Sequence, residues 1–296
     1  MRFILLFILG LFFHSYSVAE ENSQTMTENA EKKVFSVIDY EDWKAKKEIK
    51  QTKTGRVDQI IDALTLSLKD GTIIRLTGID IPDRFQPRDN LYEQAAFMRL
   101  KELLPERTEI YLFQTRKADK GRTNRMGHSL AHIVTKDENI WIQGQLLEDG
   151  FARVYAMPSN NQLVDDLYKI ESNAREAKKG IWQDNSAFKL LTLNELSNKN
   201  DEFIVVEATV QKVATVRNNI YLNFGSDWKN DFTVMITPEK RRAFSKKQID
   251  PLTLGKEVVR VRGWVREYNG PFIELEDISH LEILPKGTEL NTLGAE

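Results

Sequence analysis

The sequence predicts a β-rich α+β protein in which two domains follow one another, the second of them a small β-barrel. Three observations support this fold class. The chain has 296 residues, the length of about two ordinary domains. Strand-like runs bounded by turn residues recur in both halves, whereas long amphipathic helical patterns occur in the first half. A polar stretch at 185–199 separates the two blocks and is interpreted as a linker.

Composition limits the chemistry that the chain can perform. Hydrophobic residues make up 41% and charged residues 29%, which is typical of a globular protein with buried cores. The net charge of -2 provides no overall basic field, so any binding of nucleic acid has to depend on local patches. The absence of cysteine excludes thiol catalysis, cysteine-bound zinc, disulfides and a lipid-modified cysteine anchor.

The first residues have the pattern of a secretory signal peptide. Arg2 supplies a positive charge, and the apolar run 3–13 is too short to span a bilayer comfortably as a helix. Small residues ending at Ala19 provide a cleavage site, so we expect residues 1–19 to be removed. The mature protein is then exported to the periplasm or the medium with no membrane anchor. The polar, acidic segment 20–33 is interpreted as a flexible leader.

The first domain is expected to span residues 34–184. Lys69-Asp70-Gly71 joins two strand-like runs, and its Asp-Gly pair favours the turn of a β-hairpin. Residues 90–104 have helical apolar spacing and end before a proline. The later part is predicted to contain strands over 108–116, 129–136 and 152–157, a short helix over 139–150, and a long helix from 161 that is capped by Gly180.

Two aspartates, Asp80 and Asp83, flank a proline at the point where a strand-like run ends. Taken alone they are consistent with a turn, because Asp-x-Pro segments often form turns and helix caps. A hairpin over residues 60–80 would, however, bring Asp62 beside Asp80 and place Arg75 on the same hairpin. Carboxylates suit a hard divalent cation such as Ca²⁺, and arginine matches the oxygens of a phosphate group.

These residues belong to a longer pattern that resembles the staphylococcal nuclease (thermonuclease-like, SNase-like) family. The run DALTLSLKDGTIIRLTGIDIPD is similar to the family's first signature, and NRMGHSLAHIV, QLLEDGFARVY and GIW are similar to its later segments. The resemblance covers about residues 52–184. It implies an SNase-type, five-stranded OB barrel with packed helices for the first domain. It also implies hydrolysis of DNA or RNA phosphodiester bonds with Ca²⁺.

The resemblance assigns roles to individual residues. It implies a metal site and a phosphate-binding group, formed by Asp62, Asp80, the carbonyl of Ile81, and Arg75. Asp83 stands where the family has its general-base glutamate, and His128 stands where it has a second catalytic arginine. Aspartate is one methylene shorter than glutamate, and histidine lacks the permanently charged fork of arginine. We therefore expect weak or altered activity, because small misplacements of catalytic groups are costly.

A basic loop before Gly127 has two interpretations. A charge run is usually a solvated loop, but on the family pattern this loop flanks the pocket and could contact phosphates. The residues concerned are Arg116, Lys117, Lys120, Arg122 and Arg125. Tyr155 lies on the strand that carries nucleotide-pocket tyrosines in the family, so DNA or RNA is the expected partner. The sequence does not indicate an oligomeric state.

Residues 200–284 are predicted to form an OB-like barrel of short strands with one helical insertion at 238–247, followed by a tail at 285–296. The basic and aromatic side chains of one stretch could form a face that binds single strands; they are Arg260, Arg262, Trp264, Arg266 and Tyr268. The alternative is an ordinary barrel with Trp264 in the core and solvated arginines. A non-catalytic nucleic-acid- or protein-binding module is therefore the second functional hypothesis.

Overall fold

The computed structural model describes residues 36–82, 91–227, 229–288 and 290. The predicted signal peptide and leader lie outside the described residues, as do Asp83 and the end of the predicted tail. Within the described part, no helix is both long enough and apolar enough to cross a membrane.

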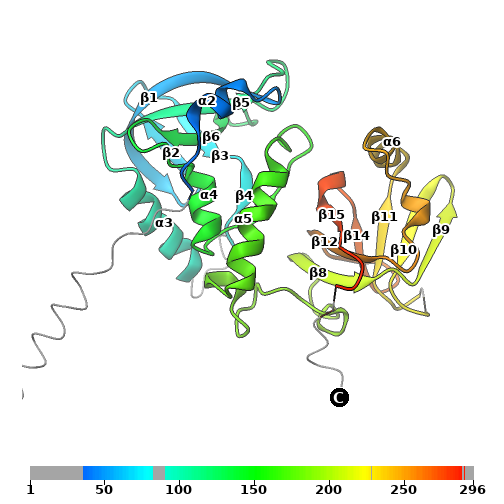
Figure 1. Ribbon diagram of the computed structural model, residues 1–296. Coiled ribbons are helices and arrows are strands. Elements are labelled where there is room, and N and C mark those ends of the chain that lie inside the picture. Colours follow the sequence, from blue (N-terminus) through cyan, green and yellow to red (C-terminus); the bar gives the residue numbers. More distant parts are fainter. Residues whose placement is uncertain (1–35, 83–90, 228, 289, 291–296) are drawn as a thin grey trace, which may run out of the picture. The chain divides into compact units, whose positions relative to one another are not determined.

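The first domain contains a closed five-stranded barrel, as predicted (Figure 1). Its strands follow the order β1-β2-β3-β6-β5, with β3 and β6 parallel and the other neighbours antiparallel. The strand bounds are β1 Ile49–Asp62, β2 Thr65–Leu68, β3 Ile73–Leu76, β5 Glu109–Thr115 and β6 Ser129–Thr135. The long, bent β1 pairs with both β2 and β5, which allows the sheet to close.

The predicted hairpin around Asp70 connects β2 and β3. Gly71 adopts a positive φ of 83°, and its N–H donates to the carbonyl of Leu68 (2.9 Å). The Asp70 carboxylate accepts a hydrogen bond from the N–H of Thr72 (3.0 Å). The turn therefore forms because glycine tolerates the left-handed conformation and aspartate satisfies a backbone donor locally.

A two-stranded sheet beside the barrel joins β4 (Gly78–Asp80) to β7 (Arg153–Tyr155). Gly78 has a φ of 83°, and a Cβ at this position would lie 2.9 Å from the Cδ1 of Leu167. Glycine is needed here for both reasons. The bend that it permits takes the chain from β3 into β4, where Asp80 comes opposite Arg153.

Four helices accompany the barrel: α2 Tyr40–Ala45, α3 Leu91–Leu103, α4 Ile142–Glu148 and α5 Val164–Glu176. The predicted helix at 90–104 corresponds to α3, and the predicted short helix corresponds to α4, whose residues 142–147 are all buried. The predicted long helix ends at Glu176, and Gly180 begins the 3-10 turn η1 (Gly180–Trp182). Gly180 lies so close to the Gly150 carbonyl that a larger residue at either glycine would require the backbone to shift.

The second β domain follows a short segment that contains the 3-10 turn η2 (Leu193–Glu195). Its elements are β8 Phe203–Thr209, β9 Lys212–Val216, β10 Asn219–Asn223, β11 Thr233–Ile236, α6 Pro238–Lys246, η3 Pro251–Thr253, β12 Val258–Trp264, β13 Arg266–Glu267, β14 Pro271–Glu274, η4 Ile278–His280 and β15 Leu281–Ile283. The described strands lie in two sheets, ordered β13-β14-β11-β10-β9 and β15-β12-β8, rather than in one closed barrel.

The core of the second domain also includes part of the predicted linker. Leu191 and Leu196 are buried in the same hydrophobic cluster as residues of β8, β10, β11 and β12. The N–H of Leu191 donates to the carbonyl of Val205 (2.9 Å). This segment packs because its leucines are apolar and spaced to reach the sheet, although most of its residues are polar.

Candidate functional site

Arg75 and Asp62 meet at the ends of β1 and β2. Thr65, the first residue of β2, pairs with both Asp62 and Arg75 in the sheet register. The Nη1 of Arg75 donates to the Thr65 hydroxyl (2.8 Å) and lies 3.4 Å from both carboxylate oxygens of Asp62. The N–H of Leu64 also donates to Asp62 Oδ1 (2.7 Å). The fold thus holds one carboxylate and one guanidinium together at a half-exposed position.

Asp80 has a different partner. Both the Nε and the Nη2 of Arg153 donate to Asp80 Oδ2, at 3.3 Å and 3.0 Å. The side chain of Arg153 is only 7% exposed and that of Asp80 is 19% exposed. Asp80 Oδ1 accepts no hydrogen bond from the residues that the structure describes. One oxygen of this carboxylate is therefore occupied by an arginine.

The donor chemistry can be compared with the needs of a hard cation. Asp62, Asp80 and the carbonyl of Ile81, a residue that is only 1% exposed, provide only oxygen donors. Ca²⁺ accepts such donors but takes six to eight of them. Among the described residues, no group of three or more His, Asp or Glu side chains is arranged to hold a metal. These are the donor types that a hard cation takes, but the described residues form no complete protein cage around one.

Glu93 in the first turn of α3 is a third carboxyl group near this site, and the sequence analysis did not identify it. Burial and the negative charge of Asp62 raise the pKa of Glu93, and the positive charge of Arg75 opposes this effect. The helix that carries Glu93 packs against β1. The one sequence signal for Glu93 was that it follows Asp80 closely along the chain. Helical spacing alone did not distinguish it from other surface glutamates.

His128 lies in a tight turn next to the strand of Arg75. The side chain of Asn124 accepts hydrogen bonds from the N–H groups of Met126 (2.9 Å) and His128 (3.0 Å). The following β6 pairs with β3, with Ile74 opposite Ser129 and Arg75 opposite Leu130. The turn therefore fixes the backbone of His128 at the start of the strand neighbouring Arg75.

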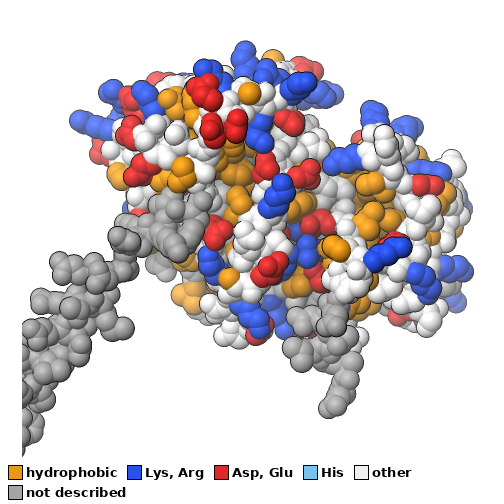
Figure 2. All heavy atoms as spheres, in the orientation of Figure 1, with side chains coloured by type: hydrophobic (Ala, Val, Ile, Leu, Met, Phe, Trp, Pro, Cys, Tyr) orange, Lys and Arg blue, Asp and Glu red, His pale blue; other side chains and the backbone are white. Residues whose placement is uncertain are grey.

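The basic loop divides into structural and free side chains. Arg122 donates to the carbonyls of Thr115 (2.9 Å) and Arg116 (3.1 Å), and Arg116 donates to the carbonyl of Lys46 (3.0 Å). The remaining cations are exposed and form no side-chain hydrogen bond or ion pair within the described ranges; they are Lys117, Lys120 and Arg125. In the face drawn in Figure 2, basic and acidic side chains are interspersed over the first domain. Any contact with a polyanion would therefore be local.

Tyr155 is packed against the second domain. Its ring centroid lies 5.0 Å from that of Phe203 and 5.9 Å from that of His280. Burial raises the pKa of Tyr155, and a hydrogen bond with Trp264 opposes the increase. The ring is thus engaged by aromatic side chains of the second domain.

Two of the arginines considered for a single-strand-binding face point inward. Arg262 is fully buried, pairs with Glu171 (2.9 Å) and Glu282 (2.9 Å), and its guanidinium lies 4.3 Å from the Tyr168 ring centroid. Arg260 donates to Glu207 (2.7 Å) and Glu282 (3.1 Å). These side chains are therefore neither solvated nor available to a nucleic-acid strand.

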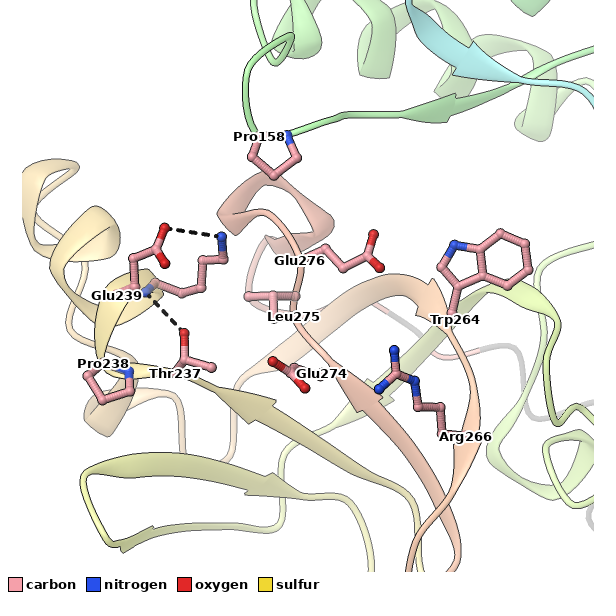
Figure 3. A pocket seen from close by; sticks show the side chains of 10 residues that line it. Pro158, Thr237, Pro238, Glu239, Trp264, Arg266, Glu274, Leu275 and Glu276 are labelled. Atoms are coloured by element: carbon pink, nitrogen blue, oxygen red, sulfur yellow. Dashed lines mark hydrogen bonds and ion pairs between the residues drawn. The ribbon is translucent and has the colours of Figure 1, made fainter. Parts of the chain in front are cut away.

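A pocket of about 530 Å³ lies beside the other members of that face. Figure 3 shows Trp264 and Arg266 on one side of it and the first turn of α6 on the other, with Glu274 and Glu276 between them. Glu239 and Lys240 of α6 form an ion pair at 3.6 Å. Three carboxylates against two cations line the pocket, which is unfavourable for a phosphate backbone.

The first domain is thus a closed five-stranded barrel in which Asp62 and Arg75 are paired. Residues 73–184 match the sequence profile of the family described as Staphylococcal nuclease homologue, so the domain has an SNase-like OB fold. An uncharacterized protein of Methanocaldococcus jannaschii is 29% identical over 153 residues, covering 43% of this chain and 70% of that protein.

Proposed function

We propose that the protein hydrolyses phosphodiester bonds of DNA or RNA with the help of Ca²⁺, and that its activity is weak or altered. The observation that carries the proposal is the Arg75 guanidinium held 3.4 Å from the Asp62 carboxylate inside an SNase-like barrel. This pair combines a group that binds phosphate oxygens with a group that binds a hard cation.

The residues of the chain have separate tasks in this proposal. Arg75 binds a phosphate oxygen and stabilises the negative charge that develops there, while Thr65 fixes its guanidinium by accepting a hydrogen bond. Asp62, Asp80 Oδ1 and the Ile81 carbonyl would hold the cation. A bound cation would neutralise charge on the scissile phosphate and lower the pKa of a coordinated water.

The departures from the family pattern account for the weak activity. Asp83 would have to position water with a side chain one methylene shorter than glutamate. His128 cannot replace a bidentate arginine, and removing one preorganised donor typically costs about 10²–10³ in rate. The exposed Lys117, Lys120 and Arg125 would contact the backbone of the bound strand without reading its sequence.

A non-catalytic binding module is the second candidate function. The Asp80–Arg153 ion pair favours it, because a carboxylate neutralised by a buried guanidinium is a weaker cation ligand. Under this alternative the exposed cations still bind nucleic acid, or the surface binds a protein partner, and no bond is cleaved.

A cleavage assay with a matched pair of variants tests the proposal. Purified protein is incubated with single- and double-stranded DNA and RNA in Ca²⁺, Mg²⁺, Mn²⁺ or chelator. Asp62→Asn should lower metal-dependent cleavage about 10²-fold or more. Asp58→Asn is the control, because Asp58 lies on the same strand and, within the described part of the chain, contacts only Lys69 and Ser67. Salt-sensitive binding without metal-dependent cleavage would contradict the enzymatic proposal and support the binding module.

We also propose that the chain is exported. The proposal is supported by Arg2, the apolar run 3–13 and the small residues ending at Ala19, all in the sequence before the described residues.

A further inference from the structure

Arg153 connects the candidate cation site to the second β domain. Its Nε and Nη2 donate to Asp80, and its Nη1 donates to the carbonyl of Phe203 (2.6 Å) at the start of β8. The guanidinium also lies 4.7 Å from the centroid of the Phe203 ring. All three nitrogens of this buried side chain are therefore used, one of them by a residue more than a hundred positions further along the chain than Asp80.

The rest of β7 is held by the same domain. The carbonyl of Val154 accepts a hydrogen bond from Arg262 Nη1 (3.2 Å), and the ring of Tyr155 packs against Phe203 and His280. Because β7 pairs with β4, these contacts also fix the strand that carries Asp80. The described residues from Ser36 onward belong to one compact unit, in which these contacts are internal.

We propose that Arg153 is a tethered counter-ion of Asp80, positioned by the second β domain, and that it lowers the affinity of the candidate site for divalent cations. The inference rests on the proposed function, since it concerns the same cation site. A cation that binds Asp80 Oδ1 must share the carboxylate with a positive charge that already contacts Oδ2. An arginine in a protein does not lose its proton, so changing the pH in the working range does not relieve this repulsion.

The tether makes the repulsion persistent. A surface arginine could turn away when a cation arrives, but the Phe203 carbonyl and ring hold this guanidinium in place. Arg153 is thus a positioning residue. The second β domain determines its effect on the cation site, although that domain supplies no cation ligand. The repulsion should appear in cation affinity, which can be measured without turnover.

Isothermal titration calorimetry with Ca²⁺ on the full chain tests this inference. Arg153→Gln removes the charge and keeps hydrogen-bonding capacity, and it should tighten Ca²⁺ binding about tenfold, the order expected when one neighbouring charge is removed. Arg153→Lys keeps the charge and should bind Ca²⁺ within about threefold of the unmodified protein. In the double variant Asp80→Asn with Arg153→Gln the gain should disappear, which locates the ion at Asp80.

Thermal denaturation without Ca²⁺ shows whether each variant is folded. If Arg153→Gln does not fold, Phe203→Leu provides the second test: it removes the ring under the guanidinium and should tighten Ca²⁺ binding by a smaller factor. An unchanged or weaker affinity in folded Arg153→Gln overturns the inference. If the unmodified protein binds Ca²⁺ in that case, the cation part of the proposed function stands. If no variant binds Ca²⁺, both fail, and the cleavage assay decides whether any hydrolysis is independent of metal.

Discussion

Replacing Glu171 by glutamine should strongly destabilise the contact between the two β domains. Glu171 Oε1 accepts hydrogen bonds from the N–H of Val154 (2.7 Å) and from Arg262 (3.0 Å), and Oε2 accepts from Arg262 (2.9 Å) and Arg175 (3.3 Å). Both oxygens thus face only donors. In Glu171→Gln an amide nitrogen must replace one of them, so two donors oppose each other and Arg262 keeps Glu282 as its remaining counter-charge.

The magnitude follows from the burial of the pair. Arg262 and Glu171 have side chains that are 0% and 1% exposed. Removing one partner of such a pair typically costs about 3–5 kcal/mol. For a chain of this size 1 kcal/mol corresponds to about 2–4 °C, so the melting temperature should fall by about 6–12 °C at the lower cost. Burial would raise the pKa of Glu171, but the charge and hydrogen bonds of Arg262 lower it, so the pair is ionised at neutral pH.

Circular dichroism during heating at pH 7 measures the effect. The control is Asp184→Asn, which breaks an ion pair with Lys178 whose side chains are 76% and 62% exposed. That change should leave the melting temperature within about 2 °C, because exposed pairs contribute little. Methionine at both 171 and 262 should recover part of the loss, since a buried apolar pair can replace an ionic one. A decrease below about 2 °C in Glu171→Gln would refute the assignment of this contact as a major stabilising one.

Four further predictions concern pH, catalysis, binding and export. Burial, and then the charge of Arg262, lower the pKa of His280 to about 4, so unfolded chains take up its proton near pH 6.5 before folded ones do. The contribution of His280 to the free energy of unfolding should therefore be complete above about pH 6.5 and fall towards pH 4. Urea denaturation at pH 5 should show about 2 kcal/mol of this loss, and replacing His280 by phenylalanine should remove it. The pair Asp83→Glu with His128→Arg should raise Ca²⁺-dependent cleavage at least about tenfold, and a folded but inert double variant would contradict the hydrolase proposal. Lys120→Ala should weaken binding to all nucleic-acid sequences alike and reduce the salt slope by about one in filter-binding titrations; an unchanged slope would leave the loop without a phosphate contact. N-terminal sequencing of exported protein should begin near Glu20, and a mature chain that retains Met1 would contradict the signal-peptide proposal.

Local signals in the sequence predicted the elements of the barrel well. The Asp70-Gly71 turn and the helix ending before Pro105 both correspond to observed features. Each depends on a backbone preference or a face pattern that operates over a few residues. The expected hairpin was different in detail, because β1 ends at Asp62 and the chain turns twice, which places Arg75 beside that carboxylate.

The partners of the buried arginines could not be predicted in this way. In the run VVRVRGW, Arg260 and Arg262 alternate with valines, a pattern that usually indicates a solvated polar face. The structure instead covers this face with α5, whose Glu171 lies 91 positions earlier in the chain. In the second domain the acceptor for Arg153 is the backbone carbonyl of Phe203, which no side-chain motif can reveal.

These contacts change what an isolated second domain would be expected to do. A fragment of residues 200–284 would expose Arg262 and Phe203 and would leave Glu207 and Glu282 as the only acidic partners of its two inward-facing arginines. Binding of nucleic acid by such a fragment could then come from a surface that is buried in the full chain. A binding test of the second domain should therefore use the full chain and change Arg266 or Tyr268, which are exposed there. If those changes have no effect on the full chain while the fragment still binds, the fragment binds through the surface that the first domain covers in the full chain. The role of the second domain is then to hold β7 and Asp80 in place.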